Sequence, residues 1–391
     1  AYVYLSCAAF TMSIFILGVK PMATFGESNP LQISQHNVNE ILSKHFPLLS
    51  DMRDGYFASK ATICSERAAL LTSVMAKNDR KLFRKMANGE EISSLERANI
   101  FAEMLDQKKA IIWHEGKHKD KSPFAGSTTT KRRGVPIYPE AIGLALWPEL
   151  AGEKESNVAI RKENPYVIGK EDLKKLERVF PEWVEFSIME LARPNCPEQM
   201  KLLEALRYIL LDKPVCITHT IPDFEEVIEL GFKGLAKRAA DLQADADEAC
   251  KHQYQAFSRI LEALSDFSLR LSKDAKKLAD ATSTSSDDKK RLNEIADVYK
   301  NVATEAPSTL REGLTVLWLC WMALHLESPN IAISLGRLDQ FLYPLYLKDK
   351  EKNKGTDNLE FYKKTVELFG HFWLKLGDHV PMVPISAERL F

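Results

Sequence analysis

Apolar residues recur at helical spacing along most of this chain, and that periodicity is the feature that most constrains its fold. Such spacing marks a helix with one face turned to a core, whereas strict alternation would mark a strand. The pattern predicts a mainly helical protein with a few strands, of which residues 330–336 are the best candidate. The predicted helical segments are 37–46, 59–78, 93–113, 171–193 with a break at Pro181, 223–283 as at least two helices, 289–303, 309–327 and 359–380.

The composition fits a globular protein with a large core and excludes some partners. Of 391 residues, 45% are hydrophobic and 27% charged, and the formal net charge is -1. No basic stripe stands out, so we expect no nucleic acid partner. The six cysteines form no C-x-x-C pair, which indicates reduced thiols in a cytoplasmic protein and no disulfide framework. Cys64, Cys216 and Cys320 lie in apolar surroundings and are predicted to be buried.

The N-terminal residues 1–35 are expected to form a tail. Residues 1–19 are apolar, but they are borderline for a membrane-spanning helix, which needs roughly 20 residues. A signal peptide would need a basic segment before the apolar run, and none is present. We expect Met22 to be the native start and residues 1–21 to be translated upstream sequence, with no membrane association. A genuine hydrophobic N-terminus is the alternative.

Residues 114–118 spell H-E-x-x-H, a pattern that can hold a catalytic zinc ion. That chemistry needs both histidines on one helical turn and a third ligand. Gly116 weakens a helix here and Pro123 ends it soon afterwards. The possible third ligands, Glu140 and Glu149, lie on no clear helical turn facing the pair. We therefore predict two surface histidines and no bound metal, and a zinc hydrolase is kept as a further alternative.

Three other stretches carry a stronger signal when they are taken together and in order. They are "FAGSTTTKRRGVPIYPE" at 124–140, "HTIPDFEEVIELGFKGL" at 219–235 and "NIAISLGRLDQFLYPLYLKD" at 330–349. The segments "TICSERAALLT", "PSTLREGLTVLW" and "ELFGHFWLKLGDHV" fit the same pattern, and "GRLDQFLYP" is the most specific piece. Over about residues 36–391 the chain resembles the glycyl radical enzymes, the pyruvate formate-lyase-like family.

The resemblance implies an α/β fold, the family's ten-stranded barrel of two five-stranded halves wrapped in helices, of which this chain would form the mainly helical N-terminal part. In the family, a cysteine loop and a glycine loop meet at the barrel centre. An activating enzyme that uses an iron–sulfur cluster and S-adenosylmethionine makes a glycyl radical, which passes to the cysteine. The resulting thiyl radical abstracts hydrogen from the substrate, and an apolar shell must exclude water and oxygen from it.

The chain departs from the family pattern in one respect. The cysteine loop and the glycine motif lie downstream in the family, whereas this sequence stops at "PISAERLF". Residues 36–391 are thus expected to be the N-terminal portion of the family's domain, truncated before the cysteine loop. They would carry no catalytic residue, bound cofactor or metal of their own, and Cys320 is predicted to be structural. We expect this segment alone to be inactive and prone to aggregate, because a divided barrel leaves an open sheet edge.

Some substrate-cavity positions of the family fall within this chain. His219 precedes "IPD", where relatives place a polar substrate contact, although a core histidine bonded to backbone is the alternative. Asp223 is expected to cap the following helix. Ile331 and Ala332 are less polar than the matching residues of polyol dehydratases, which indicates a less polar substrate. The predicted substrate-binding residues are His219, Ser328, Asn330, Ala332 and Phe391, the last as a cavity wall or an ordinary core residue.

The threonine-rich run before "GVPIYPE" resembles the arylacetate decarboxylases and fumarate-adding synthases more than pyruvate formate-lyase itself. We therefore predict part of a glycyl radical enzyme of anaerobic metabolism, a carbon–carbon lyase that decarboxylates a small arylacetate-like acid. The alternatives are a fumarate-adding hydrocarbon synthase, a formate acetyltransferase, a radical dehydratase or, in another class, a non-catalytic scaffold. The implied partners are a radical-activating enzyme, the small organic acid and a second copy of the full-length chain.

Overall fold

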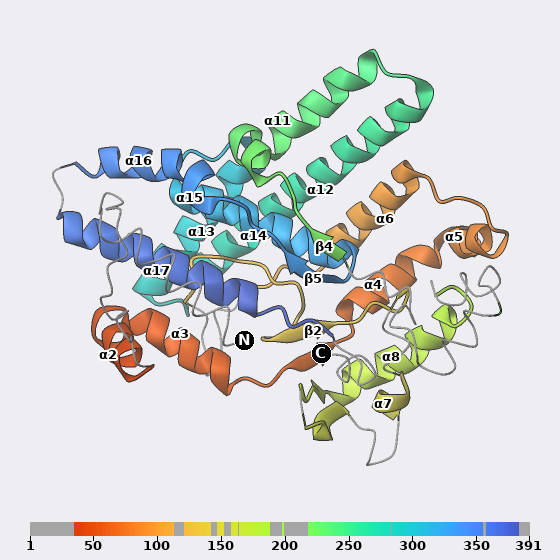
Figure 1. The fold of residues 1–391 in the computed structure, drawn as a ribbon, viewed down its shortest axis with the longest axis horizontal. Helices are drawn as coiled ribbons and strands as arrows, with labels where there is room; N and C mark the ends of the chain where they lie inside the picture. Colours follow the sequence, from red (N-terminus) through yellow and green to blue (C-terminus); the bar gives the residue numbers. More distant parts are fainter. Residues whose placement is uncertain are drawn as a thin grey trace.

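The computed structural model describes residues 35–112, 121–141, 147–151, 158–162, 164–187, 198, 218–281, 283–354 and 357–382. In this part of the chain, helices surround a few short strands (Figure 1). The elements are α2 Gln35–His45, α3 Pro47–Ala58, β1 Thr62–Cys64, α4 Glu66–Met75, α5 Lys77–Ala87, α6 Ser94–Gln107, β2 Gly134–Pro136, α7 Trp147–Ala151, the short 3-10 helix η2 Val158–Ile160, β3 Val167–Ile168, α8 Lys170–Trp183, β4 Thr218–Thr220, α11 Phe224–Ala244, α12 Glu248–Ala279, α13 Ser286–Thr304, α14 Leu310–Glu327, β5 Asn330–Ile333, α15 Leu338–Phe341, α16 Tyr343–Lys352 and α17 Asn358–Gly377.

The strands pair in parallel in two groups. One sheet has the order β2-β1-β3, with Ile63 of β1 opposite Val135 of β2 and Ile168 of β3. The chain after α17 extends this sheet through an isolated parallel bridge between Gly134 and His379. The second group is the pair β4-β5. Parallel strands need long crossovers, and helices supply them here, so the arrangement is an α/β fold of the kind expected for part of a barrel.

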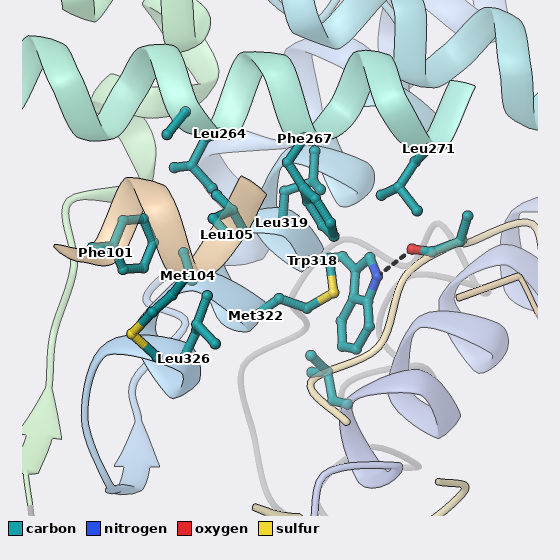
Figure 2. Packing of buried hydrophobic residues seen from close by; sticks show 14 of the residues in the cluster. Phe101, Met104, Leu105, Leu264, Phe267, Leu271, Trp318, Leu319, Met322 and Leu326 are labelled. Atoms are coloured by element: carbon teal, nitrogen blue, oxygen red, sulfur yellow. Dashed lines mark hydrogen bonds between the residues drawn. The ribbon is translucent and has the colours of Figure 1, made fainter. Parts of the chain in front are cut away.

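Part of the hydrophobic core lies between α6, α12 and α14. Figure 2 shows Leu264, Phe267 and Leu271 of α12 above the side chains of the other two helices. Trp318 of α14 is fully buried, and its indole Nε1 donates a hydrogen bond of 2.7 Å to the carbonyl oxygen of Ala125. Because α14 is buried around most of its circumference, it forms the centre of the helical layer.

Gly126 lets the loop that precedes β2 approach α14 closely. Its φ of +89 lies in the left-handed region that favours glycine, and an added Cβ would meet the Cε atom of Met322 at 2.7 Å. Met322 itself is buried against this loop (Figure 2). The glycine of the "FAGSTTT" motif therefore serves the contact between loop and helix.

Three helix predictions were wrong in detail. The helix predicted over 93–113 ends at Gln107, because the backbone becomes extended at Lys108. The segment 59–78 contains strand β1, and α4 begins only at Glu66, because β1 pairs with strands on both sides and this tertiary pairing overrides the helical periodicity. Pro181 does not break α8, which continues to Trp183. Because the proline lies in the last turn, the hydrogen bond that it removes is close to the end of the helix, and the preceding turns are unaffected.

Other predictions are confirmed. Strand β5 lies within the predicted 330–336, and the segment 223–283 forms the two helices α11 and α12. Ser93 caps α6 in a reciprocal capping box with Glu96, and Asp223 caps α11 by accepting a hydrogen bond from the backbone of Glu226. The tail 1–34 lies outside the described residues. None of the described helices has both the length and the hydropathy needed to cross a membrane.

Candidate functional site

Strands β4 and β5 place two of the predicted site positions side by side. Thr218 pairs with Asn330, but the next residue, His219, pairs with Ala332, so the register shifts by one residue at Ile331. A bulge of this kind changes which residues of two strands face each other, and bulges are common beside active sites. Without it, Ala332 would lie opposite Thr220. For His219 and Ile331 the structure describes the position in the strand.

Asn330 is a buried residue of β5 that hydrogen-bonds to β4 and to the end of α14. Its side-chain oxygen accepts a hydrogen bond of 2.5 Å from the hydroxyl of Thr220, and its Nδ2 donates to the carbonyl oxygens of Leu324 at 2.9 Å and Ser328 at 3.2 Å. These contacts fix the start of β5. Ser328 is the half-buried residue that follows α14, and its backbone N–H donates a hydrogen bond to the carbonyl oxygen of Leu324.

The carboxyl end of α14 is held by two side chains from segments that follow β1 and β2 of the other sheet. Arg67, the second residue of α4, donates from Nε to the carbonyl oxygen of Leu326 and from Nη2 to that of Glu327, both at 2.8 Å. The hydroxyl of Tyr138, two residues after β2, donates to the carbonyl oxygen of His325 at 2.7 Å. Burial raises the pKa of Tyr138, which keeps this donor protonated.

Arg67 also forms a two-pronged ion pair with Glu140. Its Nη2 lies 2.6 Å from Oε1 and its Nη1 3.2 Å from Oε2 of the carboxylate. The arginine side chain is 2% exposed and the glutamate 20%, so the pair is largely removed from water. The guanidinium carbon lies 4.0 Å from the centre of the Tyr138 ring. This arrangement joins the ends of β1 and β2 to the helix that leads into β5.

A pair of histidines is buried beside this junction. The rings of His325 and His379 stack with centres 3.7 Å apart and planes 27° apart, and Nδ1 of His379 lies 3.1 Å from the Thr128 hydroxyl oxygen. Neither ring nitrogen of His325 has a hydrogen-bond partner in the part of the chain that the structure describes. Burial lowers the pKa of His379 to about 3. Burial, and then the repulsion that would arise if both rings were protonated, lower the pKa of His325 well below its usual value. Both rings are therefore neutral near pH 7.

Several predicted residues cannot be placed or are engaged elsewhere. Phe391 and the residues 114–118 of the H-E-x-x-H pattern lie outside the described residues. Glu140 pairs with Arg67, and Glu149 forms a buried pair with Arg161. Among the residues described, no three His, Cys, Asp or Glu side chains lie together as a metal site would need.

Cys320 was predicted to be buried, but it is only half-buried on α14, where desolvation raises the pKa of its thiol to about 12. The uncharged thiol is the less reactive form. This environment agrees with the structural role expected from its apolar neighbours. Cys64 is buried as predicted, with its sulfur 3.2 Å from the Thr130 hydroxyl oxygen.

Sequence reasoning missed the junction around Arg67 and the histidine pair. Arg67 and Glu140 belong to the quoted segments "TICSERAALLT" and "GVPIYPE", and His379 belongs to "GDHV". These charged residues lie within otherwise apolar motifs, and that placement could have indicated that they are important. Nothing in their spacing, 73 residues for the ion pair, indicated that they would meet.

Comparison with known proteins relates this geometry to a family. Residues 48–391 match the family described as pyruvate formate lyase-like. The chain is 24% identical to the probable dehydratase YbiW of Escherichia coli over 81% of its own length and 37% of the relative. It is 27% identical to the glycyl radical subunit of 4-hydroxyphenylacetate decarboxylase from Clostridium scatologenes, over 50% of this chain and 24% of that protein.

The fold agrees with solved structures. The glycerol-bound B12-independent glycerol dehydratase from Clostridium butyricum superposes with a TM-score of 0.72 at 23% identity, covering 89% of this chain and 41% of that one. The chain thus spans about a quarter to two fifths of the length of these proteins. The match over most of the sequence, the parallel strands and the surrounding helices together show that the chain belongs to the pyruvate formate lyase-like family of glycyl radical enzymes.

Proposed function

We propose that β4 and β5 form one wall of the substrate cavity of a glycyl radical lyase whose substrate is a small arylacetate-like acid. The observation that carries the proposal is the shifted register, which sets His219 beside Ala332. The neighbouring polar groups of Thr220 and Asn330 are hydrogen-bonded to each other. The wall therefore offers one ionisable residue next to a methyl group.

This combination suits a substrate with one strongly polar group on an apolar body. In the proposal, the imidazole of His219 donates a hydrogen bond to the substrate carboxylate, and Ala332 borders the apolar part. Phe391 adds an aromatic surface for the ring of the substrate. A polyol would instead need several hydrogen-bonding partners, because each hydroxyl removed from water must be paired.

The reaction we propose is carbon–carbon bond cleavage with loss of carbon dioxide. In the family, the glycyl radical and the cysteine supply the hydrogen abstraction, and we assign to this chain only the binding of the substrate and the exclusion of water. The same proposal includes a radical-activating enzyme that uses S-adenosylmethionine, a second copy of the protein and a cytoplasmic location.

Dehydration is the second candidate, and one observation favours it. The match to the probable dehydratase YbiW spans 81% of this chain, whereas the match to the decarboxylase subunit spans 50%. A longer alignment reflects the scaffold as well as the site, however, and we give the site residues more weight.

An anaerobic assay tests the proposal. The protein expressed from its whole reading frame is incubated with an activating enzyme and S-adenosylmethionine, and then with 4-hydroxyphenylacetate or glycerol. We expect carbon dioxide and the decarboxylated arene from the acid. Aldehyde from glycerol without product from the acid would favour the dehydratase instead, and a stable glycyl radical signal with no turnover of either would overturn both.

A matched pair of variants tests whether His219 binds the substrate. His219→Gln should lower kcat/KM for the acid about 10- to 100-fold, since a hydrogen bond to a charged group is lost or weakened. Ala332→Gly, one strand away, removes only a methyl group and should change it much less. Equal effects from the two variants would contradict the assigned role of His219.

A further inference from the structure

The last turn of α14 differs from an ordinary helix end because side chains bind all four of its terminal carbonyl groups. A helix leaves its last four carbonyl oxygens without helical partners. Here the oxygen of Leu324, which also accepts a hydrogen bond from the Ser328 backbone, is bound by Asn330, that of His325 by Tyr138, and those of Leu326 and Glu327 by Arg67. Two of these three side chains come from segments that directly follow strands of the β2-β1-β3 sheet: Arg67 from the start of α4, after β1, and Tyr138 from the chain after β2.

Arg67 makes as many hydrogen-bond contacts in this junction as its guanidinium group has N–H donors. A guanidinium group has five N–H donors in a rigid plane. The structure gives it five contacts, to the carbonyl oxygens of Leu326, Glu327 and Ile137 and to both carboxylate oxygens of Glu140. With a side chain that is 2% exposed, water contributes little to satisfying them.

The junction lies directly before the proposed substrate wall. Glu327 ends α14, Asn330 begins β5, and Ala332 is the residue that pairs with His219. A displacement of the helix end would therefore carry β5 along β4 and alter the register that the bulge sets. The bound geometry of a site must be held closely by supporting groups if binding and reaction are to be efficient.

We infer that Arg67 is a positioning residue, which sets the register of β5 against β4 by binding the end of α14 to the segment that follows β2. It touches no substrate and acts through the helix carbonyls. Lysine cannot replace it, because a single ammonium group cannot bind two carbonyl oxygens and both oxygens of a carboxylate at once. The inference rests on the proposed function only in treating β4 and β5 as a substrate wall.

Hydrogen–deuterium exchange on the purified protein, expressed from its whole reading frame, tests this without any substrate. Arg67→Met keeps much of the volume and removes every donor, while Arg67→Lys keeps the charge. We expect both to increase exchange in the peptides that contain 328–336 and 218–223 by about 10- to 100-fold, the effect of losing hydrogen bonds from a charged group. The bond from the Ser334 backbone to the carbonyl oxygen of Thr220, 3.0 Å long, is the amide to follow.

Arg161→Met is the matched control, because Arg161 also forms a buried pair, with Glu149 near β3, and its side chain is likewise 2% exposed. It should not increase exchange selectively in β4 and β5. Uniform increases over the whole chain in all three variants would overturn the inference, since Arg67 would then be only a stabilising residue. Wild-type exchange in Arg67→Lys would also overturn it, because charge alone would suffice. If Arg67→Met does not fold, the lysine variant still decides.

None of these outcomes depends on what the enzyme acts on. If the exchange result is as expected and the assay shows no decarboxylation, the proposed function fails and the positioning role stands. If decarboxylation is found and exchange in the β4-β5 peptides is unchanged, the positioning role fails alone.

Discussion

Two arginines of this protein each hold a carboxylate through two nitrogen–oxygen contacts, yet they have different surroundings. Arg337 and Asp339, two residues apart in "GRLDQ", lie at 2.9 and 2.7 Å with side chains 68% and 40% exposed. Arg67 and Glu140 come from separate segments and are largely buried, and Arg67 also binds the end of α14. A pairing through two contacts thus serves a local turn in one place and connects distant segments of the chain in the other.

The difference shows that the ion pair in the most specific sequence motif need not contribute most to stability. "GRLDQFLYP" is the most specific run in the sequence, but its ion pair is surrounded by water, where such pairs contribute little. The buried pair has lost its hydration, so removing one partner leaves a charge that nothing else compensates. Four predictions follow that comparison from the largest expected effect to the smallest.

Glu140→Gln should have the largest effect. It leaves the Arg67 charge buried with a neutral partner, and we expect a loss of about 3 kcal/mol in the free energy of unfolding. Urea denaturation followed by circular dichroism measures it. A double-mutant cycle with Arg67→Met should give a clear coupling energy, and additive effects of the two substitutions would show that the ion pair is not what stabilises the junction.

Acid should weaken the buried region through the stacked histidines. The folded-state pKa of His379 is about 3, whereas an unfolded histidine titrates near its usual value of 6.5. The unfolded state therefore binds the proton first, and stability that is present above about pH 6.5 is lost as the pH falls toward 3. For His379 alone the loss is about 2 kcal/mol at pH 5.

The histidine prediction is checked by denaturation at a series of pH values. His379→Leu should reduce the slope of stability against pH between 6.5 and 4 relative to the wild-type protein. His252→Leu, an exposed position on α12, is the control and should leave the slope as it is. A wild-type stability that does not change over this range would contradict the assignment of neutral buried rings.

Tyr138→Phe removes one hydrogen bond from the same junction and leaves both charges paired. Because the carbonyl oxygen of His325 then lacks its buried donor, we expect a loss of about 1–2 kcal/mol in the free energy of unfolding. Thermal unfolding compares it with Tyr343→Phe, which lies 47% exposed at the start of α16. If the two variants melt alike, the hydroxyl of Tyr138 is not important for the helix end.

Asp339→Asn should have the smallest effect. Arg337 holds the pKa of Asp339 below its usual value through their hydrogen bonds, but the pair is exposed and screened by salt. We expect no measurable shift in the melting temperature at physiological ionic strength. A large destabilisation would remove the contrast between the two ion pairs and would indicate a structural role for the "GRLDQ" turn itself.

Local features were the ones that sequence reasoning predicted well. The caps at Ser93 and Asp223 depend on residues at most three positions apart, and the strand at 330–336 depends on one short apolar run. Strand β1 was missed because its three residues lie inside a helical pattern, and only its pairing with β2 and β3 makes it a strand. The candidate site was predicted as a set of positions from the family pattern, but not as an arrangement.

The sequence by itself determined the family, the helical character and the choice of His219 and Ala332 as site positions. These follow from local periodicity and from motifs in a fixed order. Only the tertiary structure decided that a register shift at Ile331 sets those two residues side by side, and that Arg67 and Tyr138 hold the end of α14. The physical reason is that strand pairing and buried ion pairs join groups that are far apart in the chain. No local sequence pattern indicates that such groups will come into contact.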